Sequence, residues 1–148
     1  MIETDFFKAK KEWSKVKDEL LGYYLKLYFA KIFATGKPVA YIDCFAGKGK
    51  YDDEKVGSPL LAMQLADEAG QRSKTGKCNI YFHFIEQVFA QELKKNLTPY
   101  TSNCYEVYDG GYNQHFANIV NQQHGNIFAY VDPFGIKFLD FNLFCMLA

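Results

Sequence analysis

Acidic residues that directly follow apolar runs are the best candidates for chemistry in this chain, and the first of them is Asp43. It opens the segment Asp43–Gly49, with the sequence DCFAGKG. Glycines such as Gly47 and Gly49 adopt positive φ angles and let the backbone approach a ligand closely. The pattern favours a loop that wraps a nucleoside with a short zwitterionic tail, whose ammonium group Asp43 would attract. The alternative is an ordinary strand exit with a capping Asp.

Two details distinguish this loop from the phosphate-binding loops of dinucleotide and P-loop enzymes. The third glycine of the dinucleotide pattern GxGxxG falls at Asp52, which disfavours a nicotinamide cofactor. No Gly-Lys-Ser/Thr sequence follows, which excludes a P-loop. An adenine-nucleotide enzyme of another Rossmann-like type stays open, although only Lys48 and Lys50 could meet its phosphates.

A second acidic residue, Glu86, ends the apolar run YFHFI. A carboxylate in this place can accept charge-assisted hydrogen bonds from both hydroxyls of a ribose. The alternatives are a helix cap and a solvated surface acid. Asp109 follows a third apolar run and could accept from an adenine amine, but an Asp before Gly110 is equally good turn chemistry.

The segment Asp132-Pro133-Phe134-Gly135 is the strongest signal after the glycine loop. An Asp oxygen and a backbone carbonyl can accept both N–H groups of a planar amine, and the ring of Phe134 can stack on the attached π-system. A tight turn is the alternative, because Asp-Pro-x-Gly also suits one. Together with Asp43 and Glu86, the segment favours a functional site.

Strands and helices alternate in the predicted secondary structure, which indicates an α/β fold with a parallel sheet covered by helices on both faces. Ligands of such sheets bind outside the carboxyl ends of the strands, so the four acidic residues should share one edge. In the first helix, the apolar series from Trp13 to Leu27 has helical spacing, and Ser58 should cap the second helix. The predicted helices cover 12–34, 58–72, 88–97, 112–123 and 138–148, and the strands cover 39–43, 79–86, 103–108 and 126–131.

Composition narrows the class of protein further. The chain has 148 residues, a formal net charge of zero and 49% hydrophobic residues, as expected of one globular domain. Its four cysteines are scattered without a CxxC pair, so we expect reduced thiols, a cytoplasmic protein and no structural metal site. No apolar run is long enough for a membrane span. Residues 8–37 hold eight lysines against three acidic residues, which indicates a solvated face or a surface for nucleic acid.

Taken together, these motifs resemble those of class I S-adenosylmethionine-dependent methyltransferases. The segment Asp43–Gly49 resembles their first motif, Glu86 matches the acidic second motif and Asp109 the third. Asp132-Pro133-Phe134 is similar to the fourth motif of enzymes that methylate exocyclic base amines, although Phe134 stands where a second Pro is usual. The resemblance implies catalytic roles for Asp132, Pro133 and Phe134. It implies cofactor contacts for Asp43, Phe45, Ala46, Gly47, Gly49, Tyr51, Glu86 and Asp109.

More closely, the chain resembles the three-Cys-motif partner protein family. The matching stretches are WSKVK from Trp13, YIDCFAGKGKY from Tyr41, GSPL from Gly57 and VDPFG from Val131. The resemblance implies an N-terminal helical segment, 1–37, and a Rossmann-like methyltransferase domain, 38–148, with strand order 3-2-1-4. Members of the family are longer, and the apolar end at 138–148 would need covering. We therefore expect the domain to lack its C-terminal half and the chain to associate with a protein partner or with itself.

The motifs and the resemblance lead to two candidate functions. The first is methyl transfer from S-adenosylmethionine to a nucleic acid, at a base amine. The second is a non-catalytic cofactor- or nucleotide-binding module that works with a partner protein.

Overall fold

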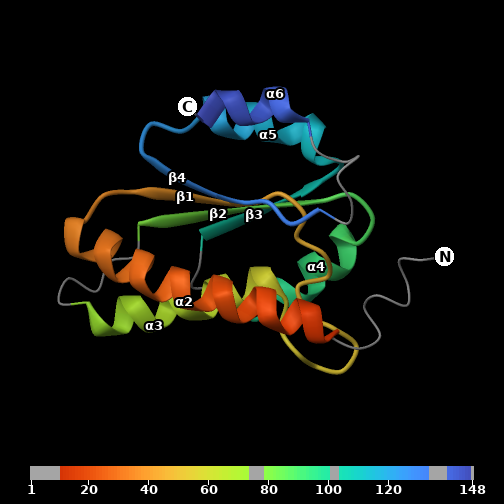
Figure 1. Ribbon diagram of the computed structural model, residues 1–148, viewed down its shortest axis with the longest axis horizontal. Helices are drawn as coiled ribbons and strands as arrows, with labels where there is room; N and C mark the ends of the chain where they lie inside the picture. Colours follow the sequence, from red (N-terminus) through yellow and green to blue (C-terminus); the bar gives the residue numbers. More distant parts are fainter. Residues whose placement is uncertain (1–10, 74–78, 101–103, 134–139, 148) are drawn as a thin grey trace.

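The fold is α/β in a computed structural model that describes residues 11–73, 79–100, 104–133 and 140–147. Helices and strands alternate as predicted (Figure 1). The order is α2 (Glu12–Thr35), β1 (Val39–Asp43), α3 (Ser58–Arg72), β2 (Ile80–Glu86), α4 (Ala90–Leu97), β3 (Cys104–Asp109), α5 (Tyr112–Asn121), β4 (Asn126–Tyr130), α6 (Phe141–Phe144) and a 3-10 turn, Cys145–Leu147.

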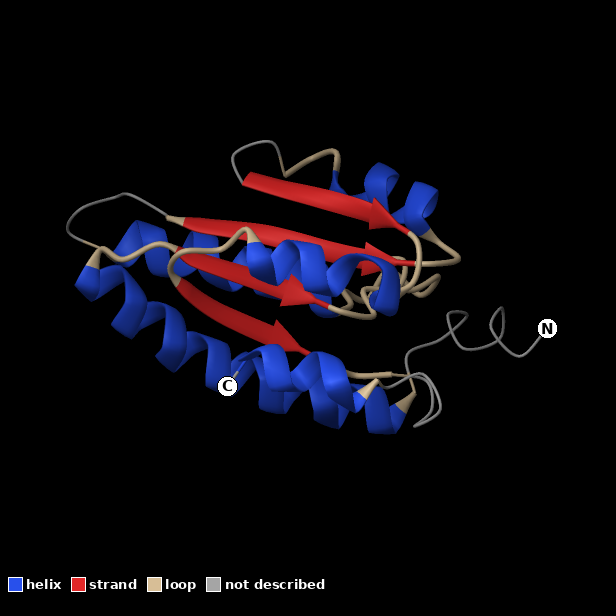
Figure 2. Cartoon of the chain, turned by 90° about the horizontal axis from the view of Figure 1, so that it is seen from above, coloured by secondary structure: helices blue, strands red, loops and turns tan. Residues whose placement is uncertain are grey.

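The four strands form one parallel sheet in the order β3-β2-β1-β4, which confirms the predicted order (Figure 2). All five residues of β1 are buried, as expected of an apolar strand with neighbours on both sides. The register brings the strand ends together, with Asp43 beside Phe84 of β2 and Glu86 beside Asp109 of β3. This arrangement is Rossmann-like.

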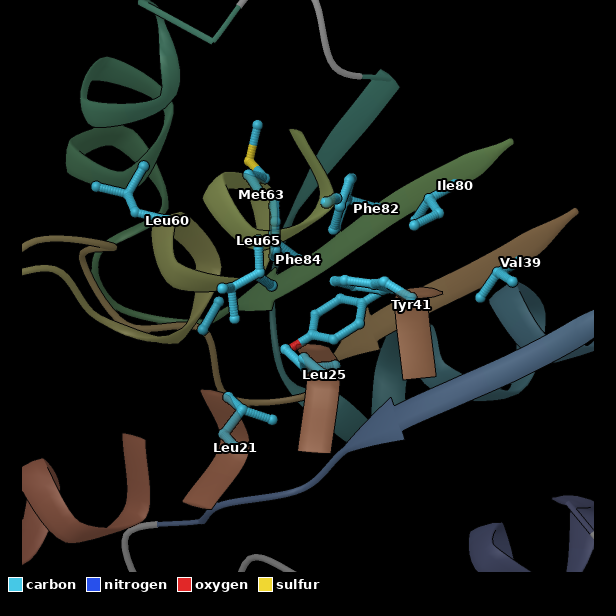
Figure 3. Packing of buried hydrophobic residues seen from close by; sticks show 14 of the residues in the cluster. Leu21, Leu25, Val39, Tyr41, Leu60, Met63, Leu65, Ile80, Phe82 and Phe84 are labelled. Carbon is cyan, nitrogen blue, oxygen red and sulfur yellow. The ribbon is translucent and has the colours of Figure 1, made fainter. Parts of the chain in front are cut away.

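Helices cover both faces of the sheet. Helices α2, α3 and α4 lie on one face, and α5 and α6 lie on the other (Figure 1). Side chains of a strand point alternately to the two faces. Tyr41 therefore belongs to the core between the sheet and α2, α3 and α4, while Ile42 belongs to the core between the sheet and α5. Figure 3 shows Tyr41 and Phe82 projecting from neighbouring strands toward residues of α2 and α3 such as Leu25. Helix α2 therefore shares one core with the sheet.

Helix α2 buries a different face from the one that its apolar spacing suggested. The buried residues include Leu21, Leu25 and Phe29, whereas Trp13 and Leu20 of the predicted series are exposed. Apolar residues occur on two sides of this helix, and periodicity alone does not tell which side meets the sheet. The sheet takes the side that carries Phe29, and the other side faces outward.

Two further details of the fold bear on the site. Gly57 is the residue that precedes α3, so the prediction that Ser58 caps this helix is wrong, and Ser58 is its first residue. Among the described residues, β4 pairs with β1 and has no partner on its other edge. No helix in the described part of the chain is long and apolar enough to cross a membrane.

Candidate functional site

The loop that leaves β1 folds back over the carboxyl end of β2. The N–H of Cys44 donates to Tyr130 O at 3.0 Å, and the N–H of Ala46 donates to Ile85 O at 3.0 Å. Gly47 and Gly49 have φ angles of 68° and 77°, where a side chain is strained. The predicted glycine loop therefore lies at the predicted edge of the sheet.

Gly49 is also needed for packing. A Cβ atom at this position would lie 2.8 Å from Leu93 Cδ1 of α4. The loop returns toward α3 when the N–H of Gly57 donates to Gly49 O at 2.8 Å, and an isolated bridge joins Lys50 to Val56. Asn96 of α4 donates its side-chain N–H to Lys48 O at 2.9 Å. Contacts with α4 and with Gly57, the residue before α3, thus fix the conformation of the loop.

Glu86 connects the loop to β2 and to the start of α4. Its Oε2 accepts the N–H of Gly47 at 2.6 Å, and its Oε1 accepts those of Val88 and Phe89 at 2.9 and 3.2 Å. Only 5% of Glu86 is exposed. The carboxylate thus satisfies three N–H groups, two of them in the turn that leads to α4. The residue that precedes α4 is Phe89, so Glu86 is neither its cap nor a solvated surface acid, the two alternatives weighed from sequence. It also brings two of the predicted cofactor residues, Gly47 and Glu86, into direct contact.

Asp43 lies inside the loop and is fully buried. Its Oδ2 accepts the hydroxyl of Ser58 at 2.5 Å, and its Oδ1 accepts the N–H of Phe45 at 3.3 Å. Burial raises the pKa of Asp43 to about 7, although these hydrogen bonds oppose the shift. The carboxylates of Asp132 and Glu86 add to the rise. Near neutral pH, Asp43 is therefore poised between its neutral and charged forms.

Asp132 forms an ion pair that no local sequence pattern predicts. Lys17 of α2 donates from Nζ to Asp132 Oδ2 at 2.7 Å, and both side chains are partly buried. Beside this pair, burial and the Asp18 carboxylate raise the pKa of Tyr51 to about 12, and a hydrogen bond with Ser14 opposes the shift. Helix α2 therefore supplies side chains to the same edge of the sheet.

The remaining predicted residues are less closely associated. Asp109 is exposed at the end of β3, and its carbonyl oxygen lies 3.1 Å from His115 Nε2. Ala46 is buried, while Phe45 is half-buried and stacks on Tyr112, with ring centroids 5.5 Å apart. Pro133 follows Asp132 in the described chain, whereas Phe134 lies outside the described residues.

Sequence reasoning missed Ser58 and Lys17 as residues of this edge. Ser58 was interpreted as a helix cap, and nothing in its neighbourhood in sequence connects it to Asp43. Lys17 and Asp132 are 115 positions apart, and no local pattern joins them. His83 of β2 is a buried histidine away from these residues. Burial lowers its pKa to about 4, and its Nδ1 lies 2.9 Å from the Tyr108 hydroxyl.

A groove lies elsewhere, between the C-terminal parts of α2 and α3. Its volume is about 520 Å³, and Lys26, Phe33, Glu68 and Arg72 are among its lining residues. These parts of the two helices lie toward the amino ends of the strands. The groove is therefore separate from the acidic residues at the carboxyl edge.

Comparison of the chain with protein-family models, with curated proteins and with solved structures gives no match.

Proposed function

We propose that this chain binds S-adenosylmethionine at the carboxyl edge of its sheet and acts as a methyltransferase on a nucleic acid, at a base amine. The observation that supports the proposal best is the 2.6 Å hydrogen bond between Gly47 N and Glu86 Oε2. It joins the glycine loop of β1 to the acidic end of β2, 39 residues away in sequence. These are the two elements that a Rossmann-like fold uses to hold a nucleoside.

The acceptor capacity of Glu86 supports this interpretation and refines it. A carboxylate offers about four acceptor positions, and Glu86 uses three of them on backbone N–H groups. The position that remains is on Oε2, beside Gly47. Glu86 would therefore accept one ribose hydroxyl without releasing the loop, rather than both hydroxyls as the sequence suggested.

Asp43 would act on the ligand through the loop and through its charge. Its side chain is buried among loop atoms, so it holds Phe45 and Ser58 in place. A ligand ammonium beside the loop would favour the charged carboxylate and draw its pKa below 7. Binding at neutral pH would then release a proton.

S-adenosylmethionine supplies an electrophilic methyl group when it is bound, so the protein has to position the acceptor. Asp132 is the residue proposed to orient an acceptor amine, and Pro133 fixes the backbone beside it. Lys17 already donates from its Nζ to Asp132 Oδ2 at 2.7 Å. An amine would have to displace Lys17 or share the carboxylate with it.

The same ion pair favours the second candidate, a cofactor-binding module that transfers no methyl group. A carboxylate paired with a lysine has part of its acceptor capacity engaged. In such a module, Asp132 would fasten α2 to the end of β4. Replacing Lys17 by Met separates the two functions, because it should increase methyl transfer if Asp132 orients the acceptor and leave a binding module inactive.

Calorimetry tests the cofactor directly, with S-adenosylmethionine, S-adenosylhomocysteine, NAD and ATP titrated in parallel. Gly47→Ala should abolish binding of the two methionine-derived ligands, because its φ of 68° disfavours a side chain. Gly36→Ala is the matched control, since Gly36 has φ 67° at the end of α2, away from the site. Binding of NAD or ATP alone would refute the proposal.

A further inference from the structure

Helix α2 carries an apolar face that the fold leaves in solvent. The side chains of this face are 45–72% exposed, although they are among the largest apolar side chains of the chain. They recur over about four turns at helical spacing, so they form one continuous stripe. The outer stripe consists of Trp13, Val16, Leu20, Tyr23, Tyr24 and Leu27.

The outer stripe is large enough for a stable protein interface. A fully exposed aromatic side chain presents roughly 200 Å² and Val or Leu less, so the six residues together expose at most roughly 750 Å² at their observed fractions. A standard interface buries about 800 Å² on each partner. Contiguous apolar patches of this size mark interaction sites rather than ordinary surface.

The position of the stripe makes it accessible to a second molecule. Tyr24 packs on Phe128 of β4 with ring centroids 5.6 Å apart, and Tyr28 does so at 5.0 Å. Phe128 belongs to the strand at the edge of the described sheet. The stripe therefore runs beside this edge, on the outside of the molecule.

The charges that flank the stripe indicate which partner fits it. Glu19 and Lys26 are both exposed, and a rotation of about 100° per residue places them on the same side of the stripe. Lys31 is exposed too, and it follows Trp13 at a separation of about five whole turns. The opposite charges of Glu19 and Lys26 therefore lie on one side of the stripe. Trp13 and Lys31 lie on one line along the helix axis.

We propose that the outer stripe binds the outer stripe of a second copy of this chain, with the two α2 helices antiparallel. In a two-fold pair, each side of one helix faces the same side of the other. When the axis passes near Gly22, Glu19 meets Lys26 of the second copy, and Lys26 meets its Glu19. The same register places Trp13 against Lys31 of the second copy, as a cation–π pair.

The apolar residues agree with this register. It sets Leu20 opposite Tyr24 of the second copy and Val16 opposite its Leu27. An alternative register centred on Leu20 would bring Lys15 against Lys26 of the second copy, which is repulsive. Charge and apolar complementarity therefore select the same antiparallel pair.

Sedimentation equilibrium of the full chain between about 1 and 100 μM tests the proposal, and it should show a reversible dimer. Replacing both Leu20 and Leu27 by Gln should weaken the dimer at least about 100-fold, because two buried apolar side chains are lost from each copy. Val88→Gln is the matched control, since Val88 is 54% exposed outside the stripe. It should leave the dimer unchanged.

Charge reversal tests the register. Glu19→Lys or Lys26→Glu alone should weaken the homodimer about tenfold, because each creates two like-charge pairs. An equimolar mixture of the two variants should restore wild-type affinity as a heterodimer, in which both pairs are again opposite in charge. A wild-type monomer at about 100 μM would overturn the proposal, as would a dimer that the Leu20/Leu27 variant does not weaken or a mixture that fails to pair. A monomer would mean that a segment of the same chain covers the stripe. A dimer that the Leu20/Leu27 variant does not weaken would mean that another surface, such as the β4 edge, forms the contact.

Discussion

Glu86→Gln should destabilise the unliganded protein, because the wild-type carboxylate accepts three backbone N–H groups in a buried position. Gln has one acceptor oxygen and one NH₂ donor in place of two acceptor oxygens. If its NH₂ replaces Oε2, the N–H of Gly47 faces a donor. If it replaces Oε1, the N–H groups of Val88 and Phe89 do. Either rotamer leaves at least one buried N–H without an acceptor.

The expected magnitude follows from these contacts. An orphaned buried N–H costs about 1–3 kcal/mol, and the loss of charge weakens the bonds that remain by about 1 kcal/mol. We therefore expect the free energy of unfolding to fall by about 2–4 kcal/mol. For a chain of this size, each kcal/mol lowers Tm by about 2–4 °C, so Tm should fall by about 5–15 °C.

Urea unfolding followed by circular dichroism measures the change, with Asp109→Asn as the control. Asp109 lies beside Glu86 in the register of the sheet, but its side chain is exposed. The control should change the free energy of unfolding by less than about 0.5 kcal/mol. If Glu86→Gln proves equally mild, Glu86 does not hold the loop, and the argument for one ribose hydroxyl loses its basis.

Three further predictions concern the same edge. The pKa of Asp43 is about 7 in the fold against 3.8 ordinarily, so the stability that Asp43 contributes should fall as pH rises from about 4 to 7, by on the order of 4 kcal/mol. His83, whose pKa is lowered to about 4, has the opposite effect in both proteins, so the quantity to follow in urea titrations is the difference in free energy of unfolding between wild type and Asp43→Asn, which should shift by that amount against the wild type across this range. Gly49→Ala should cost more than about 2 kcal/mol by thermal unfolding, since its Cβ would lie 2.8 Å from Leu93 Cδ1 at φ 77°, and a milder loss would show that the loop yields. Lys17→Met should cost about 0.5–1 kcal/mol, because the ion pair with Asp132 is partly exposed, and a cycle with Asp132→Asn should show coupling of that size.

The sheet and the place of the site could be predicted from the sequence. Short apolar runs that alternate with longer amphipathic segments have few packing solutions, so the parallel sheet could be predicted from the pattern. Its order 3-2-1-4 was expected from the resemblance to class I methyltransferases. Acidic residues at the ends of these runs had to meet at one edge, because all strands of a parallel sheet end on the same side. The glycine loop could be placed as well, since glycine adopts the positive φ angles at positions 47 and 49 with less strain than other residues.

How the polar groups at that edge are satisfied depends on the three-dimensional packing. Glu86 accepts the N–H of Gly47, which is 39 residues away in sequence, and the lysine that donates to Asp132 is 115 residues away. Such partners are brought together by the fold, and no local sequence pattern predicts them. The inward face of α2 was undetermined for a related reason. The helix is apolar on two sides, and the shape of the sheet selects the side with Phe29 while Leu20 is left in solvent.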